Sequence, residues 1–379
     1  MNPRPGRGPE VLFPRTTGIA EISGVQGELT LEVDAEGRIS ADFISADQVP
    51  DSQEWLGTVE TRDVAATLID GRNATLRDCA LTRSTVAFGR KEGSRFELGL
   101  VPNGLTVVCS TATPGSIEFA LVNQWLTLRE HLQFDGFDME IRPADPDAGG
   151  HAGLAKGKPS WITQLVAVPT PDPASEGEVV EVIECLAYTL SLLTMEHVVA
   201  PLRRVLDAQG EMIRWEFRRT FWPVHSGRNT PYVGRIAAPL HVVGERQVRR
   251  KFEELDLKRY IDYLLESRRL DMYAELCLTC VLFALESLGA AWFLSEGCSS
   301  EDVATKSIVT KLDHINSRLR FIPKKYKSDW LYDGLRNPLV HTGAVPLMTP
   351  TDVHRATEEL LVLAADIFFR IFDFDKSAA

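Results

Sequence analysis

The amino-acid sequence predicts an α+β protein, in which a β-rich, antiparallel, sandwich-like N-terminal domain is followed by an all-α helical bundle. Apolar and polar residues alternate with period two in short segments of the front part. Beyond about residue 245 the apolar residues recur three or four positions apart, which is the helical period. A length of 379 residues fits two or three domains of roughly 100–200 residues each.

The front part contains repeated hairpin signals. Residues 28–33 alternate in polarity, residues 34–37 (Asp-Ala-Glu-Gly) form a turn signal, and residues 38–43 resume the alternation. The dipeptide Asp70-Gly71 separates another such pair. Further short strands are expected at 66–69, 74–77, 94–101, 105–109, 116–119 and 161–168.

The same patterns divide the chain into three parts. Residues 1–19 are rich in Pro, Gly and Arg and are expected to be a flexible tail. Residues 20–240 are expected to form the β-rich domain, with a helix at about 178–206. Residues 245–379 are expected to form the helical domain, with helices at 248–266, 272–294, 303–319 and 353–372.

Residues 211–222 show alternation with aromatic residues on one side. Trp215 and Trp222, together with Arg214, Arg218 and Arg219, fit either of two readings. An aromatic and basic surface of this kind binds single-stranded nucleic acid. The preferred interpretation is a strand whose aromatic residues face a core and whose arginines face solvent.

Charge and cysteine usage indicate the setting. The whole chain has a formal net charge of −12, but residues 245–345 contain 16 Lys+Arg and 15 Asp+Glu, so the excess of acid lies elsewhere. No apolar stretch of signal-peptide length opens the chain, and its six cysteines are scattered. The most apolar segment, 276–294, contains Glu286 and is interpreted as a buried helix. We therefore expect a cytoplasmic protein with no membrane partner.

Neither a metal nor a cofactor is expected. Cys277 and Cys280 have CxxC spacing, but they lie in an apolar helical segment and no second ligand pair follows. No Gly-rich nucleotide-binding motif is present. The two thiols are interpreted as buried and inert.

The segment with chemical potential contains Arg336, Asn337 and His341. Histidine transfers protons near neutral pH, and the planar guanidinium of arginine binds phosphate and stays charged. These groups suit RNA cleavage by transesterification, in which a 2′-hydroxyl attacks the neighbouring phosphorus without a metal. Three lysines that precede the segment are candidate contacts to the RNA backbone: Lys324, Lys325 and Lys327.

Pro338 predicts a helix start at this segment, because proline fits the first helical turn. Asn337 is then a candidate N-cap, and Arg336 lies just before free backbone N–H groups that favour an anion. His341 is expected about one turn further on, close enough to share a phosphate with Arg336.

Arg336, Asn337 and His341 resemble the signature of HEPN domains. The preceding apolar segment 282–288 (Leu-Phe-Ala-Leu-Glu-Ser-Leu) looks like a helix of the same family, which implies that Glu286 orients Arg336. Ordinary surface charge is the alternative role of Glu286. The resemblance covers roughly residues 245–375 and implies a homodimeric, metal-independent endoribonuclease.

The front part resembles the N-terminal domain of ApeA-type abortive-infection proteins over roughly residues 20–240. The segments that carry this resemblance are 27–29, 37–39, 56–59, 74–79 and 190–194. It implies antiphage defence, with tRNA or mRNA as the substrate and a phage-derived trigger at the N-terminal domain. A non-catalytic HEPN module for dimerisation or RNA binding is the alternative. An open cleft shared by Arg336 and His341 favours the nuclease, whereas a buried His341 bonded to backbone favours the module.

Overall fold

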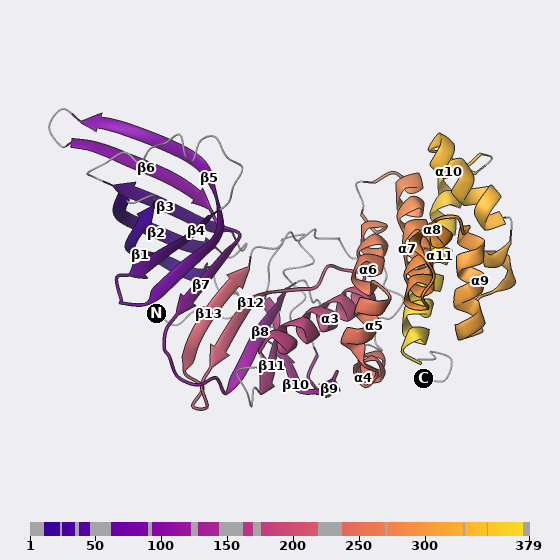
Figure 1. Ribbon diagram of the computed structural model, residues 1–379, viewed down its shortest axis with the longest axis horizontal. Coiled ribbons are helices and arrows are strands. Elements are labelled where there is room, and N and C mark those ends of the chain that lie inside the picture. The colour runs from indigo at the N-terminus through magenta and orange to yellow at the C-terminus, as the bar shows by residue number, and fades with distance from the viewer. Residues whose placement is uncertain are drawn as a thin grey trace. The chain divides into compact units, whose positions relative to one another are not determined.

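The computed structural model describes most of the chain and supports a mixed α and β fold, with strands dominating the front part and helices the back. The chain divides into two compact units, whose elements are labelled in Figure 1. The first unit comprises residues 1–129, 140–177 and 199–223, and the second comprises 130–139, 178–198 and 224–379. The described residues are 11–22, 25–34, 38–45, 62–89, 93–122, 128–143, 162–169, 176–218, 237–269, 272–328, 330–346 and 348–373.

Six antiparallel strands of the first unit close into a ring. The strand β4 pairs with β1 on one side and with β5 on the other, which completes the order β4-β1-β2-β3-β6-β5. The ring encloses a core of aliphatic and aromatic side chains. The strands are β1 (Val11–Ile22), β2 (Val25–Asp34), β3 (Ile39–Ser45), β4 (Arg62–Leu68), β5 (Asn73–Gly89) and β6 (Gly93–Val101).

The sheet continues from β5 in the order β7-β13-β12-β8-β11-β10. The described strands therefore form one continuous antiparallel sheet that closes at one end, whereas a sandwich needs two separate sheets packed face to face. The added strands are β7 (Gly104–Val108), β8 (Ser116–Val122), β10 (Phe137–Pro143), β11 (Ile162–Pro169), β12 (Val199–Leu206) and β13 (Met212–Arg218).

The predicted hairpin of residues 28–43 is confirmed. The strands β2 and β3 pair antiparallel, with Leu29 opposite Phe43 and Leu31 opposite Ala41. All four of these side chains are buried, as the alternation predicts. The Asp70-Gly71 turn is also present, and Gly71 has a φ of +84°, where glycine is strongly favoured.

The prediction of a flexible tail over residues 1–19 is wrong from Val11 onward. Residues 1–10 lie outside the described part, but Val11–Ile22 is the strand β1, which pairs with β2. Phe13 is buried, and its ring centroid lies 5.1 Å from that of Trp215. Pro14 and Gly18 disfavour a strand locally, but pairing with β2 and the aromatic contact stabilise one here.

The aromatic residues of strand β13 are buried, which agrees with the interpretation of a strand whose aromatic residues face a core. Trp215 and Phe217 are buried in the core, and their rings stack at a centroid distance of 6.1 Å. Arg214 pairs with Glu176 and with Glu216. Trp222 and Arg219 lie outside the described residues.

The predicted helix at 178–206 is too long. Helix α3 spans Glu176–Thr194, and residues 199–206 form the strand β12 instead. Met195 adopts a left-handed φ of 53°, and the Ser191 hydroxyl accepts a hydrogen bond from Val198 N at 2.9 Å, which closes the helix end. Pro201 also disfavours helical backbone at the residue before it.

The second unit is mainly helical, with α7 (Ala274–Ser295) as its central helix. Helices α6, α9 and α11 all pack against α7. Residues 178–198, which contain most of α3, also belong to this unit. The predicted single boundary near residue 240 therefore assigns these residues to the wrong unit. The other helices are α4 (Ala237–Gly244), α5 (Val248–Glu254), α6 (Leu257–Glu266), α8 (Ser300–Ala304), α9 (Ile308–Leu319) and α11 (Pro350–Ile371).

Helix α7 is long and apolar enough to cross a membrane by composition. Its apolar residues also have a role within the bundle, because residues such as Leu278, Leu285 and Leu288 are fully buried against neighbouring helices. This packing agrees with the prediction of a buried helix, and it explains why α7 is rich in apolar residues. Cys277 and Cys280 are only half-buried, so the prediction that both are buried is wrong. Desolvation still raises the pKa of the Cys280 thiol to about 11, so this thiol is protonated at neutral pH.

Asp262 on α6 gives the second unit a pH-dependent stability. Burial raises the pKa of its carboxyl to about 6, and Tyr188 on α3 donates a hydrogen bond to Oδ2 at 3.4 Å. Since the pKa is raised in the folded state, this group's contribution is fully present below its unfolded pKa of about 4 and is lost as the pH rises through about 6.

We therefore expect Asp262→Asn to raise the free energy of unfolding by about 2 kcal/mol at pH 7.5, relative to its effect at pH 4.5. Urea unfolding at both pH values measures the difference. The exposed Asp352→Asn serves as a control for a carboxylate whose pKa is lowered, so its pH effect has the opposite sign. An equal effect of Asp262→Asn at the two pH values contradicts the assignment.

Candidate functional site

The residues of the motif lie on one continuous helical segment. A π-helical turn, η3 (Trp330–Arg336), leads directly into α10 (Asn337–Thr342). Pro338 has no N–H, and its ring crowds the carbonyl four residues earlier in a regular α-helix. The wider π turn before it accommodates this, and such turns often mark functional positions.

The predicted N-cap role of Asn337 is wrong. Arg336 already has helical dihedral angles, φ −65° and ψ −50°, so α10 continues a helical turn. The Asn337 amide instead reaches Asp333 Oδ1 at 3.5 Å, at the limit of a hydrogen bond. The argument for an anion site at a free helix start therefore does not apply here, and phosphate binding must depend on side chains.

Glu286 of α7 holds Arg336 by a short ion pair. Arg336 Nε donates to Glu286 Oε1 at 2.7 Å, and the two side chains are only 25% and 18% exposed. The hydrogen bond from Arg336 raises the pKa of the guanidinium against the opposing effect of burial. The pair fixes the direction of Arg336 and leaves its two terminal nitrogens without hydrogen-bond partners among the described residues.

His341 lies on α10, and its side chain is exposed. No hydrogen bond joins its imidazole to the residues that the structure describes, so it is neither buried nor bonded to backbone. Five residues along an α-helix correspond to about 140° of rotation and about 7.5 Å of rise. The structure therefore places Arg336 and His341 on one helical segment but on different sides of it.

The three lysines of the basic segment differ in their surroundings. Lys324 and Lys325 belong to the short helix η2 (Lys324–Lys327), and both are exposed. Lys325 Nζ pairs with Glu359 Oε2 of α11 at 2.8 Å and lies 4.6 Å from the centre of the Tyr326 ring. These contacts raise the pKa of Lys325. The side chain of Lys327 lies outside the described residues.

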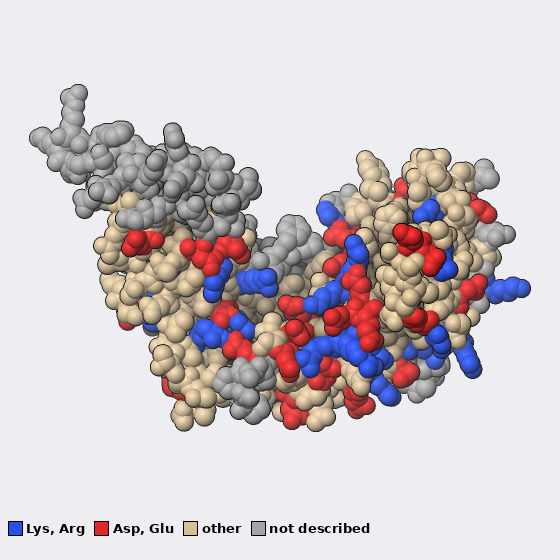
Figure 2. Space-filling model, viewed as in Figure 1, with Lys and Arg blue, Asp and Glu red and all other residues tan. Residues whose placement is uncertain are grey.

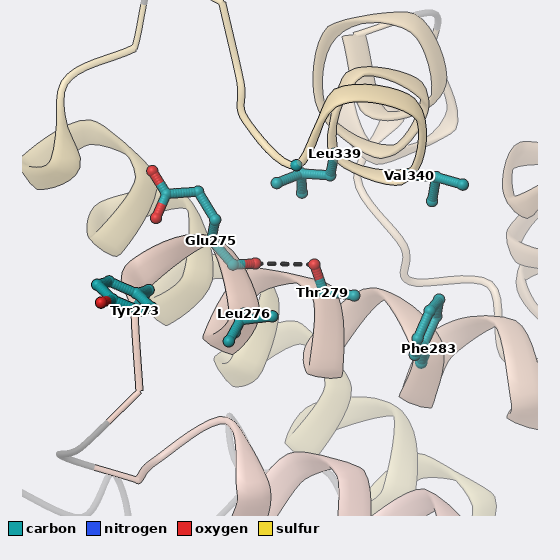
Figure 3. A pocket seen from close by; sticks show the side chains of 8 residues that line it. Tyr273, Glu275, Leu276, Thr279, Phe283, Leu339 and Val340 are labelled. Carbon is teal, nitrogen blue, oxygen red and sulfur yellow. Dashed lines mark hydrogen bonds between the residues drawn. The ribbon is translucent and has the colours of Figure 1, made fainter.

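An apolar groove lies between α7 and α10, beside the motif. Its volume is about 510 Å³. In Figure 3, Leu339 and Val340 of α10 face the side chains of α7 across the groove. Neither Arg336 nor His341 lines it. The residues that form the groove are Tyr273, Glu275, Leu276, Thr279, Phe283, Leu339, Val340 and Gly343.

Several groove residues are large, apolar and exposed, which the sequence analysis missed. They include Tyr273, Leu276, Phe283 and Val340. The sequence feature that could have indicated these exposed residues is the 276–294 segment, which is apolar on more of its surface than one buried helix face needs. A contiguous exposed apolar surface is uncommon on soluble monomers and is typical of interaction sites.

Sequence reasoning also missed Lys311, which is only 8% exposed. It lies on α9 near Glu286 and Arg336, whose charges act on it. The sequence feature that could have identified Lys311 is its position among Ile308, Leu312 and Ile315, which form the buried face of α9. On the face of the helical unit that Figure 2 shows, basic and acidic side chains intermingle, so this face has no broad basic surface.

The chain matches no protein-family model, and no curated protein matches it. Among solved structures, a MAP kinase from Leishmania major aligns over 96% of this chain and 85% of that chain, with 9% identity and a TM-score of 0.14. A score this low carries no argument about fold or function. The interpretation of the site therefore depends on the residues described above.

We expect Glu286→Gln to destabilise the protein by about 1–3 kcal/mol, because it leaves the half-buried Arg336 without its charged partner. The matched control is Glu359→Gln, which removes the carboxylate of the exposed Lys325 pair and should cost less than about 1 kcal/mol. The midpoint of urea unfolding measures both. Equal losses for the two variants contradict a special role for Glu286.

Proposed function

We propose that this chain is a metal-independent endoribonuclease of the HEPN type. The observation that carries the proposal is the arrangement of Arg336, which Glu286 holds in a half-buried ion pair, and the exposed His341 on the same helical segment. An oriented arginine suits phosphate binding, and an exposed histidine suits proton transfer.

The proposed reaction is a transesterification. The 2′-hydroxyl loses its proton to a base, and its oxygen forms a bond to the adjacent phosphorus. The bond from phosphorus to the 5′-oxygen breaks, and an acid protonates that leaving oxygen. The products are a 2′,3′-cyclic phosphate and a 5′-hydroxyl end. Arg336 stabilises the charge on the phosphoryl oxygens, and His341 transfers a proton.

In the proposed role, Asn337 supports the turn between η3 and α10, and Lys324 and Lys327 follow the RNA backbone. Lys325 must leave Glu359 to contact RNA in the same way. The substrate is tRNA or mRNA, and the setting is antiphage defence in the cytoplasm, with a phage-derived trigger acting on the N-terminal unit. This biological setting follows from the resemblance to ApeA-type proteins and not from the geometry of the site.

A non-catalytic HEPN module is the second candidate. The apolar groove favours it, because Tyr273, Leu276 and Val340 provide a docking surface that includes neither Arg336 nor His341. In this alternative the helical unit only dimerises or binds RNA. The two candidates differ in the effect of removing His341.

We expect purified protein to cut tRNA or mRNA in the presence of EDTA, and we expect His341→Ala to reduce the rate by about 10²–10⁴-fold. Since the side chain is exposed, its loss should change the free energy of unfolding by no more than about 0.5 kcal/mol. Gel analysis of the fragments and kinase labelling of their 5′-hydroxyl ends measure cleavage.

The matched control is His354→Ala, which removes another exposed histidine from α11. It should leave the cleavage rate unchanged. Activity that EDTA abolishes and magnesium restores contradicts the mechanism. A stable His341→Ala protein that still cuts RNA removes the case for catalysis by this motif.

We further propose that two copies associate through the apolar groove. A twofold axis places the same surface on both copies, and one histidine per chain cannot readily serve as base and acid at once. A second copy supplies a second His341. A specific interface of this kind should bury at least about 1,000 Å² in total.

We expect the protein to be a dimer at micromolar concentration by light scattering, and we expect Val340→Asp to make it monomeric and inactive on RNA. A charge in the centre of an apolar interface is not compensated by a partner. The control is Val362→Asp on α11, which changes a similarly exposed valine away from the groove. A monomeric wild-type protein with full activity contradicts the proposal.

A further inference from the structure

Lys311 occupies a core position of helix α9. Its neighbours on the buried face are Ile308, Leu312 and Ile315, and Lys311 itself is only 8% exposed. Lysine is almost never buried to this extent unless it is paired. Its burial therefore needs an explanation in the surrounding structure.

The close approach of α7 and α9 accounts for the burial. A Cβ built on Gly289 of α7 would lie 2.5 Å from Lys311 Cβ and 3.4 Å from its Cα, so no residue with a side chain fits there without movement. Gly289 lies three residues after Glu286, and residues with this spacing share one face of a helix. Lys311 therefore packs on the face of α7 that carries Glu286.

The ammonium of Lys311 has no hydrogen bond or ion pair with any residue in the described part of the chain. Glu286 attracts it, but that carboxylate already accepts the hydrogen bond from Arg336 Nε at 2.7 Å. Arg336 repels it. The group thus contains two cations and one carboxylate. The stem of Lys311 is buried, but its Nζ is not one of the fully buried polar atoms that lack a partner in the described part of the chain, so the ammonium reaches solvent.

Burial lowers the pKa of Lys311, while Glu286 opposes this shift. Because the ammonium of Lys311 is accessible to solvent, an anion can reach it. The terminal nitrogens of Arg336, which have no partners among the described residues, can donate two hydrogen bonds to two oxygens of one phosphate. The cluster has one more cation than carboxylates, and an anion with oxygen acceptors matches it.

We propose that Lys311 and Arg336 together form a phosphate-binding site, in which Lys311 takes one oxygen of a phosphate and the terminal nitrogens of Arg336 take others. The site deepens the proposed function and rests on it for the identity of the ligand, an RNA phosphodiester. Lys311 then contacts the substrate beside the motif that sequence reasoning identified.

Lys311→Met tests this proposal, because it keeps an unbranched apolar stem and removes the charge. The probes are inorganic phosphate and a 2′-O-methyl RNA oligonucleotide, which lacks the attacking hydroxyl. We expect phosphate to raise the melting temperature of the wild-type protein, since a ligand that binds the folded state stabilises it. Lys311→Met should lose this shift and bind the oligonucleotide about 10- to 100-fold more weakly.

Two further variants separate charge from packing. Lys311→Arg keeps the cation and should restore part of the phosphate shift. Arg355→Met removes an exposed cation from α11 and should bind both probes as the wild type does. Without any ligand, Lys311→Met should melt near the wild-type temperature, because methionine keeps an unbranched apolar stem between the helices and the ammonium has no partner to lose among the described residues.

The outcomes distinguish this proposal from the nuclease assignment. If Lys311→Met binds phosphate and oligonucleotide as tightly as the wild type, the proposed site is wrong even if the enzyme cuts RNA. If binding depends on Lys311 but the wild type does not cut RNA, the phosphate site stands and the nuclease assignment fails. If Lys311→Met does not fold, Lys311→Gln provides the same comparison.

Discussion

The ion pair between Glu286 and Arg336 joins two segments of the sequence that lie 50 positions apart. It connects the central helix of the bundle to the helical segment that carries the motif. Helix α7 is buried against α6, α9 and α11, so Glu286 has a fixed position from which to direct Arg336. The orientation of the arginine therefore depends on the packing of the whole bundle, and not only on the turn in which the arginine lies.

The same helix separates the site into surfaces with different chemistry. Near Glu286 and Gly289, α7 meets Lys311 of α9, and positive charge collects there. Toward its start, α7 faces α10 across an apolar groove. His341 lies on another side of α10 from Arg336. In the proposed enzyme, a phosphate at Arg336 is therefore reached by an imidazole from a second copy, or after a movement of α10.

Sequence patterns predicted those features that depend on local periodicity. The alternation around Leu29 and Leu31 predicted buried strand positions, and the helical spacing predicted α7. Features set by distant contacts were not predictable in this way. The end of α3 depends on the left-handed Met195, and helix α6 begins after Asp256, where φ is 47°. The predicted N-cap role of Asn337 was wrong because a π turn precedes it and the helical segment is continuous there. A proline in the sequence fits both a new helix start and such a continuous segment.

Lys311 shows why a site can be missed even where a motif is noticed. Pattern reading treats a lysine within an amphipathic helix as a solvated residue, since its charge favours water. The closeness of Gly289 shows that α9 approaches α7 at Lys311, so the stem of the lysine is buried between the two helices. An apolar side chain would fill the same place between the helices, so packing alone gives little reason for a lysine here. In the proposed enzyme, a phosphate that binds Lys311 together with Arg336 gives such a reason.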